Sequence, residues 1–423
     1  MRVDWENRTL GDLAQVEMGQ SPPSEYVSDQ MGTGVAFLQG NAEFTDVYPM
    51  PRLWCRRPAK MSAAGDALIS VRAPVGAINR ADRAYCIGRG LAAVRFRSLY
   101  PDFGFHALGH RAPVLRNVAQ GTTFEAVGGY ELRALSFSVP PPAEQRRIAE
   151  ILDTLDEGIR ATEQVIAKLQ QVKQGLLHDL LTRGIDEHGE LRDPGRHPEQ
   201  FKDSPLGLVP RDWIVQSVEE LLADVDPAMR SGPFGSALLK DELVSAGVPL
   251  LGIDNVHVER FVREFTRFVT LRKAGELSRY RVRPQDVMIT IMGTVGRCAL
   301  VPDDIGEALS SKHVWTLTFD QTRYSPYLAC LQFNYAPWVL AHFGQDEQGG
   351  IMSAIRSETL RTTQLPVPPP DEQRRIVSVL SDLDQRLASE ALDADKLRTL
   401  KHGLMDDLLT GRVRVRVPKE ASP

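Results

Sequence analysis

The sequence predicts an α+β protein in which two mixed α/β globular units are separated by two long helices, with a pseudo-twofold internal repeat. Three observations predict this fold class. A segment of 44 residues, 139–182, aligns without a gap on 367–410, with 21 identical positions at a constant offset of 228. Each copy has the heptad pattern of a long helix, and each follows a globular stretch with weaker internal similarity. The parts therefore follow one another in the order globular, helical, globular, helical.

The repeated segments predict long helices. Three prolines precede each helix, at 140–142 and 368–370, and no proline follows for about forty residues. Apolar residues recur at alternating spacings of four and three, which is the seam of a coiled coil. We expect each seam to be buried against the duplicate helix, because a lone helix with one apolar stripe is unstable in water. The seam residues are Ile148, Leu152, Leu155, Ile159, Leu169, Leu176, Ile376, Leu380, Leu383, Leu387, Leu397 and Leu404.

Polar residues interrupt the seam at two equivalent places in each copy. Thr162 aligns with Glu390, and Lys173 aligns with Lys401. Polar residues at seam positions fix register and partner choice at some cost in stability. We therefore expect these positions to specify how the two helices pair.

The globular units combine strands with short helices. Residues 67–72 and 287–292 alternate in polarity and end in a Val-Gly turn, so we expect half-buried strands there. Residues 186–210 are rich in proline, glycine and charge, which predicts an exposed connector. The tail after Arg412 is expected to be loose or to add a strand. Further strands are predicted at 90–96 and 314–319, and short helices at 10–18 and 217–223.

Composition narrows the class of protein. The formal net charge of -5 taken alone argues against a nucleic-acid binder, which usually has excess Lys and Arg. However, the connector 186–210 has six acidic residues against three basic ones, so part of the imbalance lies outside the globular units. The four cysteines form no CxxC pair, which disfavours a zinc ribbon or a disulfide-stapled fold. No signal peptide or membrane-spanning run is found, so we expect a cytoplasmic protein with no membrane partner.

Catalytic motifs are not found in the sequence. There is no GxxxxGK[ST] loop for ATP and no GxGxxG after a strand. His106 and His110 lie four residues apart without an HExxH acid, so we interpret them as structural rather than metal ligands. Asp303, Asp304, Glu307 and Lys312 loosely resemble a nuclease cluster, but their spacing is poor and a solvated loop is the better interpretation. We therefore expect no catalytic residues and no metal site.

The repeated pattern resembles the specificity subunit of type I restriction-modification systems. The resemblance rests on VPPPxEQRRI followed by a long amphipathic helix and a DLLT end, present twice at this separation. It covers essentially the whole chain, including DALISVRAPVG at 66–76 and the connector. The duplicated VPPPxEQRRI is a specific signal, and a single copy would be a moderate one.

The resemblance implies that two target recognition domains each read one half of a bipartite, gapped DNA sequence. It also implies that the two helices pack as an antiparallel coiled coil that docks two methyltransferase subunits and sets the gap. Restriction subunits with helicase and endonuclease activity would join the complex. S-adenosylmethionine, ATP and Mg are expected on those partner subunits, with no cofactor in this chain. The implied parts are recognition domains at 1–139 and 211–366, spacer helices at 140–185 and 367–412, a connector at 186–210 and a tail at 413–423.

Candidate DNA contacts are long polar donors on loops and strand ends, since such groups make base and phosphate contacts. These positions are our choice from residue type and place, and no family motif supports them. In the first domain we choose Gln39, Asn41, Arg72, Asn79, Arg80, Arg89, Thr122 and Thr123, and in the second Asn255, Arg297, Lys312 and His313.

Two other functions remain open from sequence alone. A coiled-coil adaptor whose globular units bind proteins rather than DNA would have the same helices. A free-standing nuclease would need metal-dependent cutting by the isolated chain. DNA binding that weakens steeply with salt separates the leading hypothesis from the adaptor.

Overall fold

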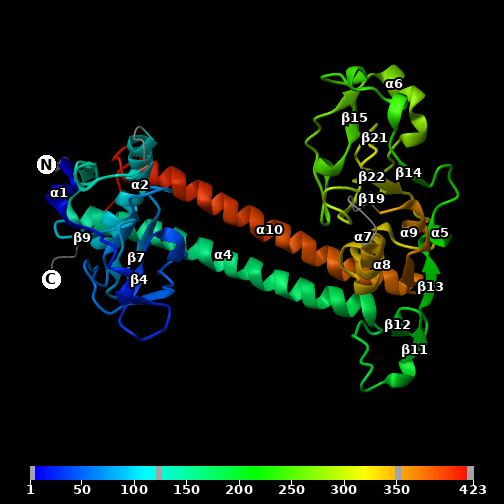
Figure 1. The fold of residues 1–423 in the computed structure, drawn as a ribbon, viewed down its shortest axis with the longest axis horizontal. Coiled ribbons are helices and arrows are strands. Elements are labelled where there is room, and N and C mark those ends of the chain that lie inside the picture. Colours follow the sequence, from blue (N-terminus) through cyan, green and yellow to red (C-terminus); the bar gives the residue numbers. More distant parts are fainter. Residues whose placement is uncertain (1–4, 121–125, 348–354, 417–423) are drawn as a thin grey trace. The chain divides into compact units, whose positions relative to one another are not determined.

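The computed structural model describes residues 5–120, 126–347 and 355–416. The chain divides into two compact units. Unit 1 comprises Met1–Val165 with Glu390–Pro423, and unit 2 comprises Ile166–Ser389. Each long helix thus contributes one segment to each unit (Figure 1). Among the described residues, no helix is both long and apolar enough to cross a membrane.

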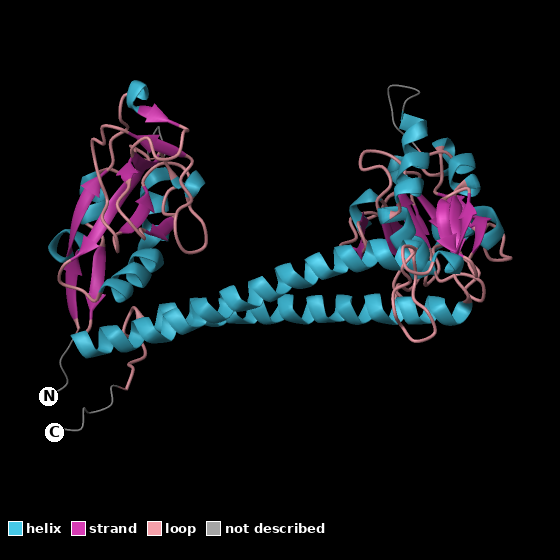
Figure 2. Cartoon of the chain, turned by 90° about the horizontal axis from the view of Figure 1, so that it is seen from below, coloured by secondary structure: helices cyan, strands magenta, loops and turns pink. Residues whose placement is uncertain are grey.

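The two long helices are α4 (Pro142–Thr182, 41 residues) and α10 (Pro370–Leu408, 39 residues). Within each unit their segments run antiparallel (Figure 2). All the predicted seam residues are buried or half-buried, so the coiled-coil pattern is confirmed. Ile148 and Leu152 pack into the core of unit 1 beside Leu408, and Ile376 and Leu380 occupy the same place in unit 2.

The lysines that interrupt the seam make equivalent ion pairs across the helices. In unit 1 the Lys401 ammonium pairs with Asp156, and in unit 2 the Lys173 ammonium lies 2.7 Å from Asp384. The two lysines differ in number by the repeat offset of 228, and so do the two aspartates. The same cross-helix contact therefore occurs once in each unit. Thr162 and Glu390 are half-buried, and the Thr162 hydroxyl donates to the Gly158 carbonyl of its own helix.

The part of unit 1 before α4, here called domain 1, contains two four-stranded sheets. The first has the order β2-β9-β6-β7 and is antiparallel, and the second has the order β3-β5-β4-β8 with β4 and β8 parallel. Strand β1 pairs with β10 at the entrance to α4. The elements are β1 Glu6–Thr9, α1 Leu10–Leu13, β2 Ala14–Met18, β3 Val27–Ser28, β4 Val35–Leu38, β5 Leu53–Cys55, β6 Ala67–Ser70, β7 Ile78–Arg80, β8 Cys86–Ile87, β9 Leu91–Phe96, α2 Pro101–Gln120, α3 Gly129–Arg133 and β10 Ser136–Val139.

The part of unit 2 between the long helices, here called domain 2, repeats this topology. Its first sheet has the order β14-β22-β19-β20, and its second has the order β18-β15-β21 with β15 and β21 parallel. Strand β13 pairs with β23 as β1 does with β10. The elements are β13 Ile214–Ser217, α5 Val218–Leu221, β14 Met229–Ser231, β15 Val248–Leu251, β16 Val256–His257, β17 Arg260–Phe261, β18 Phe268–Val269, α6 Leu271–Glu276, β19 Val287–Thr290, β20 Cys298–Leu300, β21 Leu309–Ser310, β22 Val314–Leu317, α7 Pro326–Tyr335, α8 Pro337–Glu347, α9 Ser357–Thr362 and β23 Gln364–Val367.

Three local expectations differ from the structure. Strands β6 and β19 are buried on both faces rather than on one, because Leu68 and Ile69 pack into separate cores on opposite sides of the sheet. The helix expected at 10–18 stops at Leu13, where the chain pairs as β2 with β9. The connector contains a hairpin, β11 (Phe201–Ser204) with β12 (Gly207–Pro210), whose Phe201 is buried.

The Glu-Gln pair of the repeated motif fastens each long helix to its domain. In unit 2 the Glu372 carboxylate accepts from the Trp213 indole N–H at 3.0 Å and from both terminal nitrogens of Arg192. In unit 1 Glu144 accepts from Trp5 at 3.2 Å and from Arg414. The next residue, a glutamine in both motifs, accepts from the backbone N–H of Tyr100 in unit 1 and of Ser325 in unit 2. Structural contacts thus account for the retention of this motif.

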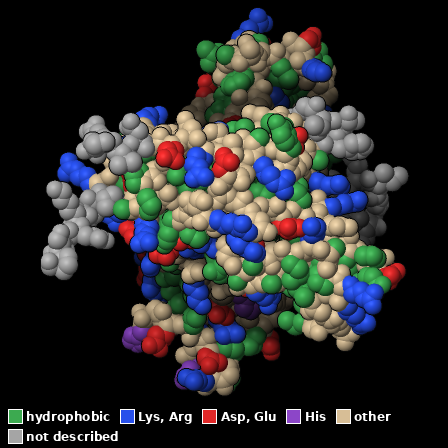
Figure 3. Space-filling view, turned by 90° about the vertical axis from the view of Figure 1, so that its left-hand side faces the viewer, with side chains coloured by type: hydrophobic (Ala, Val, Ile, Leu, Met, Phe, Trp, Pro, Cys, Tyr) green, Lys and Arg blue, Asp and Glu red, His purple; other side chains and the backbone are tan. Residues whose placement is uncertain are grey.

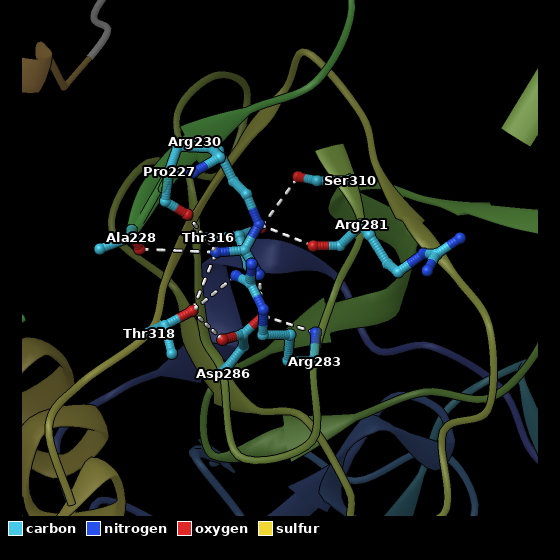
Figure 4. A network of polar contacts seen from close by, with 9 residues as sticks. All are labelled: Pro227, Ala228, Arg230, Arg281, Arg283, Asp286, Ser310, Thr316 and Thr318. Carbon is cyan, nitrogen blue, oxygen red and sulfur yellow. Dashed lines mark hydrogen bonds and ion pairs between the residues drawn. The ribbon is translucent and has the colours of Figure 1, made fainter. Parts of the chain in front are cut away.

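A buried polar network lies beneath the first sheet of domain 2 (Figure 4). Arg230 on β14 forms an ion pair with Asp286, and the Thr318 hydroxyl donates to the same carboxylate at 2.5 Å. Arg230 also donates to the backbone oxygen of Arg281. Burial raises the pKa of Asp286, although Arg230 and Thr318 act in the opposite direction. This network links three strands and a loop by charge, in addition to the apolar core formed by Met229, Val287 and Leu317.

Candidate nucleic-acid interface

Several loops of domain 1 meet at one end of its two sheets. The Gly88 N–H donates to the Leu38 carbonyl, and the Val71 N–H donates to the Gly90 carbonyl. These bonds join the loops that follow β4, β6 and β8. A Cβ at Gly90 would lie 2.7 Å from the Gln39 carbonyl oxygen, so only glycine allows this approach. We call this cluster loop end 1.

Three of the predicted DNA contacts lie exposed on loop end 1. Gln39 follows β4, Arg72 follows β6 and Arg89 follows β8, and each has an exposed side chain. Asn41 is half-buried in the short 3-10 turn after Gln39. The structure therefore brings together side chains that are far apart in the sequence. Their donors are free to reach a ligand, as base or phosphate contacts require.

Other predicted contacts of domain 1 are held inside the domain. Asn79 is 2% exposed and its amide donates to the Thr45 carbonyl. Arg80 lies on β7, where it pairs with Asp102 and its guanidinium stacks over the Phe105 ring. Thr122 and Thr123 lie outside the described residues.

Domain 2 repeats this arrangement with different side chains. The Ser311 N–H donates to the Leu251 carbonyl and the Ile291 N–H to the His313 carbonyl, as at the equivalent positions of domain 1. Strand pairing aligns Lys312 with Arg89. Lys312 is exposed and His313 half-buried. Both line a hollow of about 310 Å³. We call this cluster loop end 2.

The remaining predicted contacts of domain 2 differ in their surroundings. Asn255 is 1% exposed, and its amide donates to the carbonyls of Val262 and Glu264. Arg297 is half-buried at the turn after β19, beside the Ile291 to His313 hydrogen bond. Its backbone N–H donates to the Thr290 hydroxyl at 3.0 Å. Arg297 thus belongs to loop end 2, whereas Asn255 holds a turn.

Sequence reasoning missed several residues of the loop ends. Lys240, Arg267 and Ser311 line the hollow of loop end 2, and Ser21 accepts from the Arg89 N–H in loop end 1. Alignment of the two halves could have indicated Ser311 as the neighbour of Lys312. Strand pairing aligns Arg267 with Leu53 of domain 1, an apolar residue, so the repeat did not indicate a basic contact there.

The histidines of α2 fasten that helix to the long helices. His106 is 2% exposed and lies 2.8 Å from Asp153 on α4, and His110 lies 2.9 Å from Asp406 on α10. Potential ligand atoms of His106, Asp153 and Asp156 lie within 4.8 Å of one another, as in a metal site. Lys401 already pairs with Asp156, so we interpret the cluster as an ion-pair network. Burial raises the pKa of Asp153, but His106, together with Arg80 and Lys401, lowers it, and the net pKa is lowered.

The acidic residues that loosely resembled a nuclease cluster are paired separately. Asp304 pairs with Arg263, and Glu307 pairs with Arg281. Asp303 accepts from the Gln285 amide at 2.7 Å. These contacts fit the solvated-loop interpretation.

Charge on the surface is mixed. Figure 3 shows the side of the molecule on which unit 1 faces the viewer. Basic side chains are scattered there in small groups among apolar and acidic ones. A continuous basic stripe is typical of proteins that bind DNA tightly through phosphates alone. On this face, charge therefore indicates local contacts rather than one long clamp.

Comparison with known proteins places these features in a family. The family model described as "Type I restriction modification DNA specificity domain" matches residues 2–171 and 252–397. The putative MjaX specificity subunit of a type I restriction enzyme from Methanocaldococcus jannaschii is 38% identical over 186 residues, 43% of this chain. The match spans 44% of that relative's length. The EcoDI specificity subunit from Escherichia coli is 20% identical over 398 residues, covering 90% of this chain and 81% of its own.

Solved structures have the same fold. A type I restriction-modification S subunit from M. genitalium aligns with a TM-score of 0.59 at 16% identity, covering 96% of both chains. A chain from a study of complex assembly and conformational transition of the type I R-M system aligns with a TM-score of 0.56 at 17% identity, covering 97% of this chain and 98% of that one. With a family model matching most of its length, this chain belongs to the type I restriction-modification DNA specificity family.

Proposed function

We propose that this chain is the sequence-reading subunit of a type I restriction-modification complex. Loop end 1 and loop end 2 each read one half of a bipartite, gapped duplex DNA target. The observation that carries this proposal is the duplicated loop end, in which one backbone framework presents Arg89 in one domain and Lys312 in the other. The same backbone with different side chains suits the reading of two different half-sites.

Side chains that contact DNA come from the exposed and half-buried members of each loop end. Gln39, Asn41, Arg72 and Arg89 serve in domain 1. Arg297, Lys312 and His313 serve in domain 2. Asn79, Arg80 and Asn255 support the neighbouring turns, because their donors are already used within the protein. Thr122 and Thr123 keep their place as candidates on sequence grounds alone.

The helix pair docks two methyltransferase subunits and sets the gap between half-sites. A continuous helix of 41 residues is about 60 Å long at 1.5 Å per residue. In unit 2 a hollow of about 680 Å³ beside α4 and α8 offers a concave seat lined by Leu177, Trp338 and Leu387. Within the described part of the chain, the buried Trp338 indole N–H has no hydrogen-bond partner, and an acceptor from a partner subunit would satisfy it.

Chemistry belongs to other subunits under this proposal. The methyltransferase subunits bind S-adenosylmethionine, and restriction subunits use ATP and Mg for translocation and cleavage. This chain holds no cofactor and performs no catalysis. The complex works in the cytoplasm, where the DNA lies.

Co-expression with the methyltransferase subunits tests the proposal. Sequencing that detects methylated bases is expected to show one split motif that depends on this chain. Gel-shift with a duplex containing that motif is expected to give a band that weakens steeply with salt. A chain that neither associates with the methyltransferase nor alters which sequence is methylated would overturn the proposal, and the adaptor function would replace it.

A further inference from the structure

The hollow of loop end 2 is lined by donors and apolar groups. It has a volume of about 310 Å³, and its apolar side is formed by Leu238, Leu243 and Leu250. Its polar side chains are Lys240, Arg267, Ser311, Lys312 and His313. No carboxylate is among the lining side chains. A ligand that fits this hollow must therefore offer acceptors and negative charge.

Positive charge in the hollow is incompletely compensated. Among the described residues, the ammonium groups of Lys240 and Lys312 have no ion-pair partner, whereas Arg267 pairs with Asp254. Burial, with Lys312 and Arg267 nearby, lowers the pKa of His313. Like charges that face one hollow repel each other until an anion enters. An anion bound in the hollow would compensate this charge.

The Ser311 hydroxyl is a second, independent observation. Ser311 is 4% exposed, and its Oγ is buried without a hydrogen-bond partner. A buried hydroxyl without a partner costs free energy and needs an explanation in a native protein. The loop after β14 passes close to Ser311 at Gly232, where an added Cβ would lie 2.2 Å from the Ser310 carbonyl oxygen. This loop therefore encloses Ser311 from one side. A bound acceptor would satisfy the hydroxyl.

We propose that this hollow binds a phosphodiester of the DNA backbone, with Lys240, Lys312 and Ser311 as its donors. The inference rests on the proposed function and assigns loop end 2 a contact that is independent of base sequence. A phosphodiester has acceptors and a negative charge but no donor, which matches the lining. A base edge carries no net charge, so it would not compensate the ammonium groups of Lys240 and Lys312.

Domain 1 has different residues at the positions aligned with this hollow. Strand pairing aligns Gly88 with Ser311, Arg89 with Lys312 and Gly90 with His313. Gly88 and Gly90 have no side chains, so the hydroxyl of Ser311 and the imidazole of His313 have no equivalents in domain 1. We therefore assign the enclosed phosphate contact to domain 2 alone.

The test compares two duplexes with the full chain in its complex with methyltransferase subunits. One duplex contains the methylated motif and the other has random sequence. Lys312→Gln is expected to weaken binding to both by the same factor, about tenfold, and to reduce the salt slope by about one. Ser311→Gly, which copies domain 1, is expected to act in the same direction but less. Arg272→Gln is the control, since Arg272 on α6 is exposed and outside the hollow.

Outcomes separate this inference from the proposed function. If Lys312→Gln changes which bases are methylated, or weakens only the motif duplex, the residue reads bases and the phosphate assignment is wrong while the proposed function stands. Unchanged affinity for both duplexes also overturns the assignment. If inorganic phosphate binds the native chain through Lys312 but DNA affinity does not depend on it, the ligand is a free anion. A native complex without sequence preference would instead defeat the proposed function.

Discussion

The two domains have the same strand framework, but the arginine of the equivalent ion pair lies on a different strand in each domain. Asp66 and Asp286 occupy the same position at the start of β6 and β19, and each accepts from a backbone N–H three residues earlier. In domain 1 the partner is Arg95 on β9, whereas in domain 2 it is Arg230 on β14. The aspartate is thus the same in both domains, whereas the arginine that pairs with it comes from a different strand in each. The framework therefore constrains charge balance rather than individual residues.

The loop ends differ more than the framework does. Backbone hydrogen bonds are repeated at Gly88 and Ser311 and at Gly90 and His313, yet the exposed side chains are different. By contrast, the Glu-Gln motif and the cross-helix lysine pairs are the same in both units. Positions that hold the fold are thus preserved, whereas the exposed positions of the loop ends have diverged.

Neutralising the shared aspartate is expected to affect the two domains unequally. Asp286→Asn leaves Arg230 buried without a counter-charge, which costs about 3–5 kcal/mol. Asp66→Asn leaves Arg95, whose side chain is 46% exposed and can turn to water, so the cost is smaller, about 1–2 kcal/mol. Hydrogen exchange resolved along the full chain measures both. Equal losses would show that burial of the arginine is not what separates the domains.

Removing the motif glutamate sharpens the comparison between the units. Glu372→Ala leaves the buried Trp213 indole N–H without an acceptor and removes the counter-charge of Arg192, and we expect a loss of about 2–3 kcal/mol in unit 2. Glu144→Ala is expected to cost about 1 kcal/mol in unit 1, since the Arg414 side chain is 42% exposed. Limited proteolysis of each unit reports the difference. A larger effect in unit 1 would contradict it.

The helix that follows the first sheet responds to pH differently in the two units. His106 contacts Asp153 in unit 1, whereas in unit 2 the Tyr327 hydroxyl donates to Asp384 at 2.7 Å. The pKa of Asp153 is lowered, so its contribution is present above about pH 4 and is lost as the pH falls further. The pKa of Tyr327 is raised by burial, so that contribution is lost only as the pH rises above about 10.

Hydrogen exchange of α2 and α7 at pH 3, 7 and 10.5 checks this difference. We expect α2 to loosen first in acid and α7 to loosen first in alkali. His106→Gln keeps a polar side chain but removes the imidazole, so it is expected to flatten the acid response of α2. An acid response that persists in this variant would assign it to other groups.

Much of the fold could be predicted because it is repeated. The heptad seam and the offset of 228 gave the helices and their pairing, including the positions of Lys173 and Lys401. The acceptors Asp156 and Asp384 carry the same offset and could have been predicted too. Arg192 and Arg414 could not, because they reach the equivalent glutamates from a connector and a tail of different lengths.

The site was harder to predict than the fold. Asn79 and Asn255 have side chains of a type that reads bases, but both are buried and their amides donate to backbone carbonyls of their own domains. Burial of a loop residue depends on contacts with distant segments, which local sequence does not contain. Glycine at 88, 90 and 232 was the available signal for loops packed closely together. Had these glycines been interpreted as places where two backbone segments approach closely, both loop ends could have been located.

The central claim is a division of labour, in which the helices set the gap and the loop ends read the bases. Inserting one heptad at the same level in α4 and α10 keeps the seam and lengthens each helix by about 10 Å, roughly three base pairs. Mapping methylated sites in cells with the altered complex measures the result. The account predicts unchanged half-sites separated by a longer gap. An altered half-site, or the original gap, would contradict it.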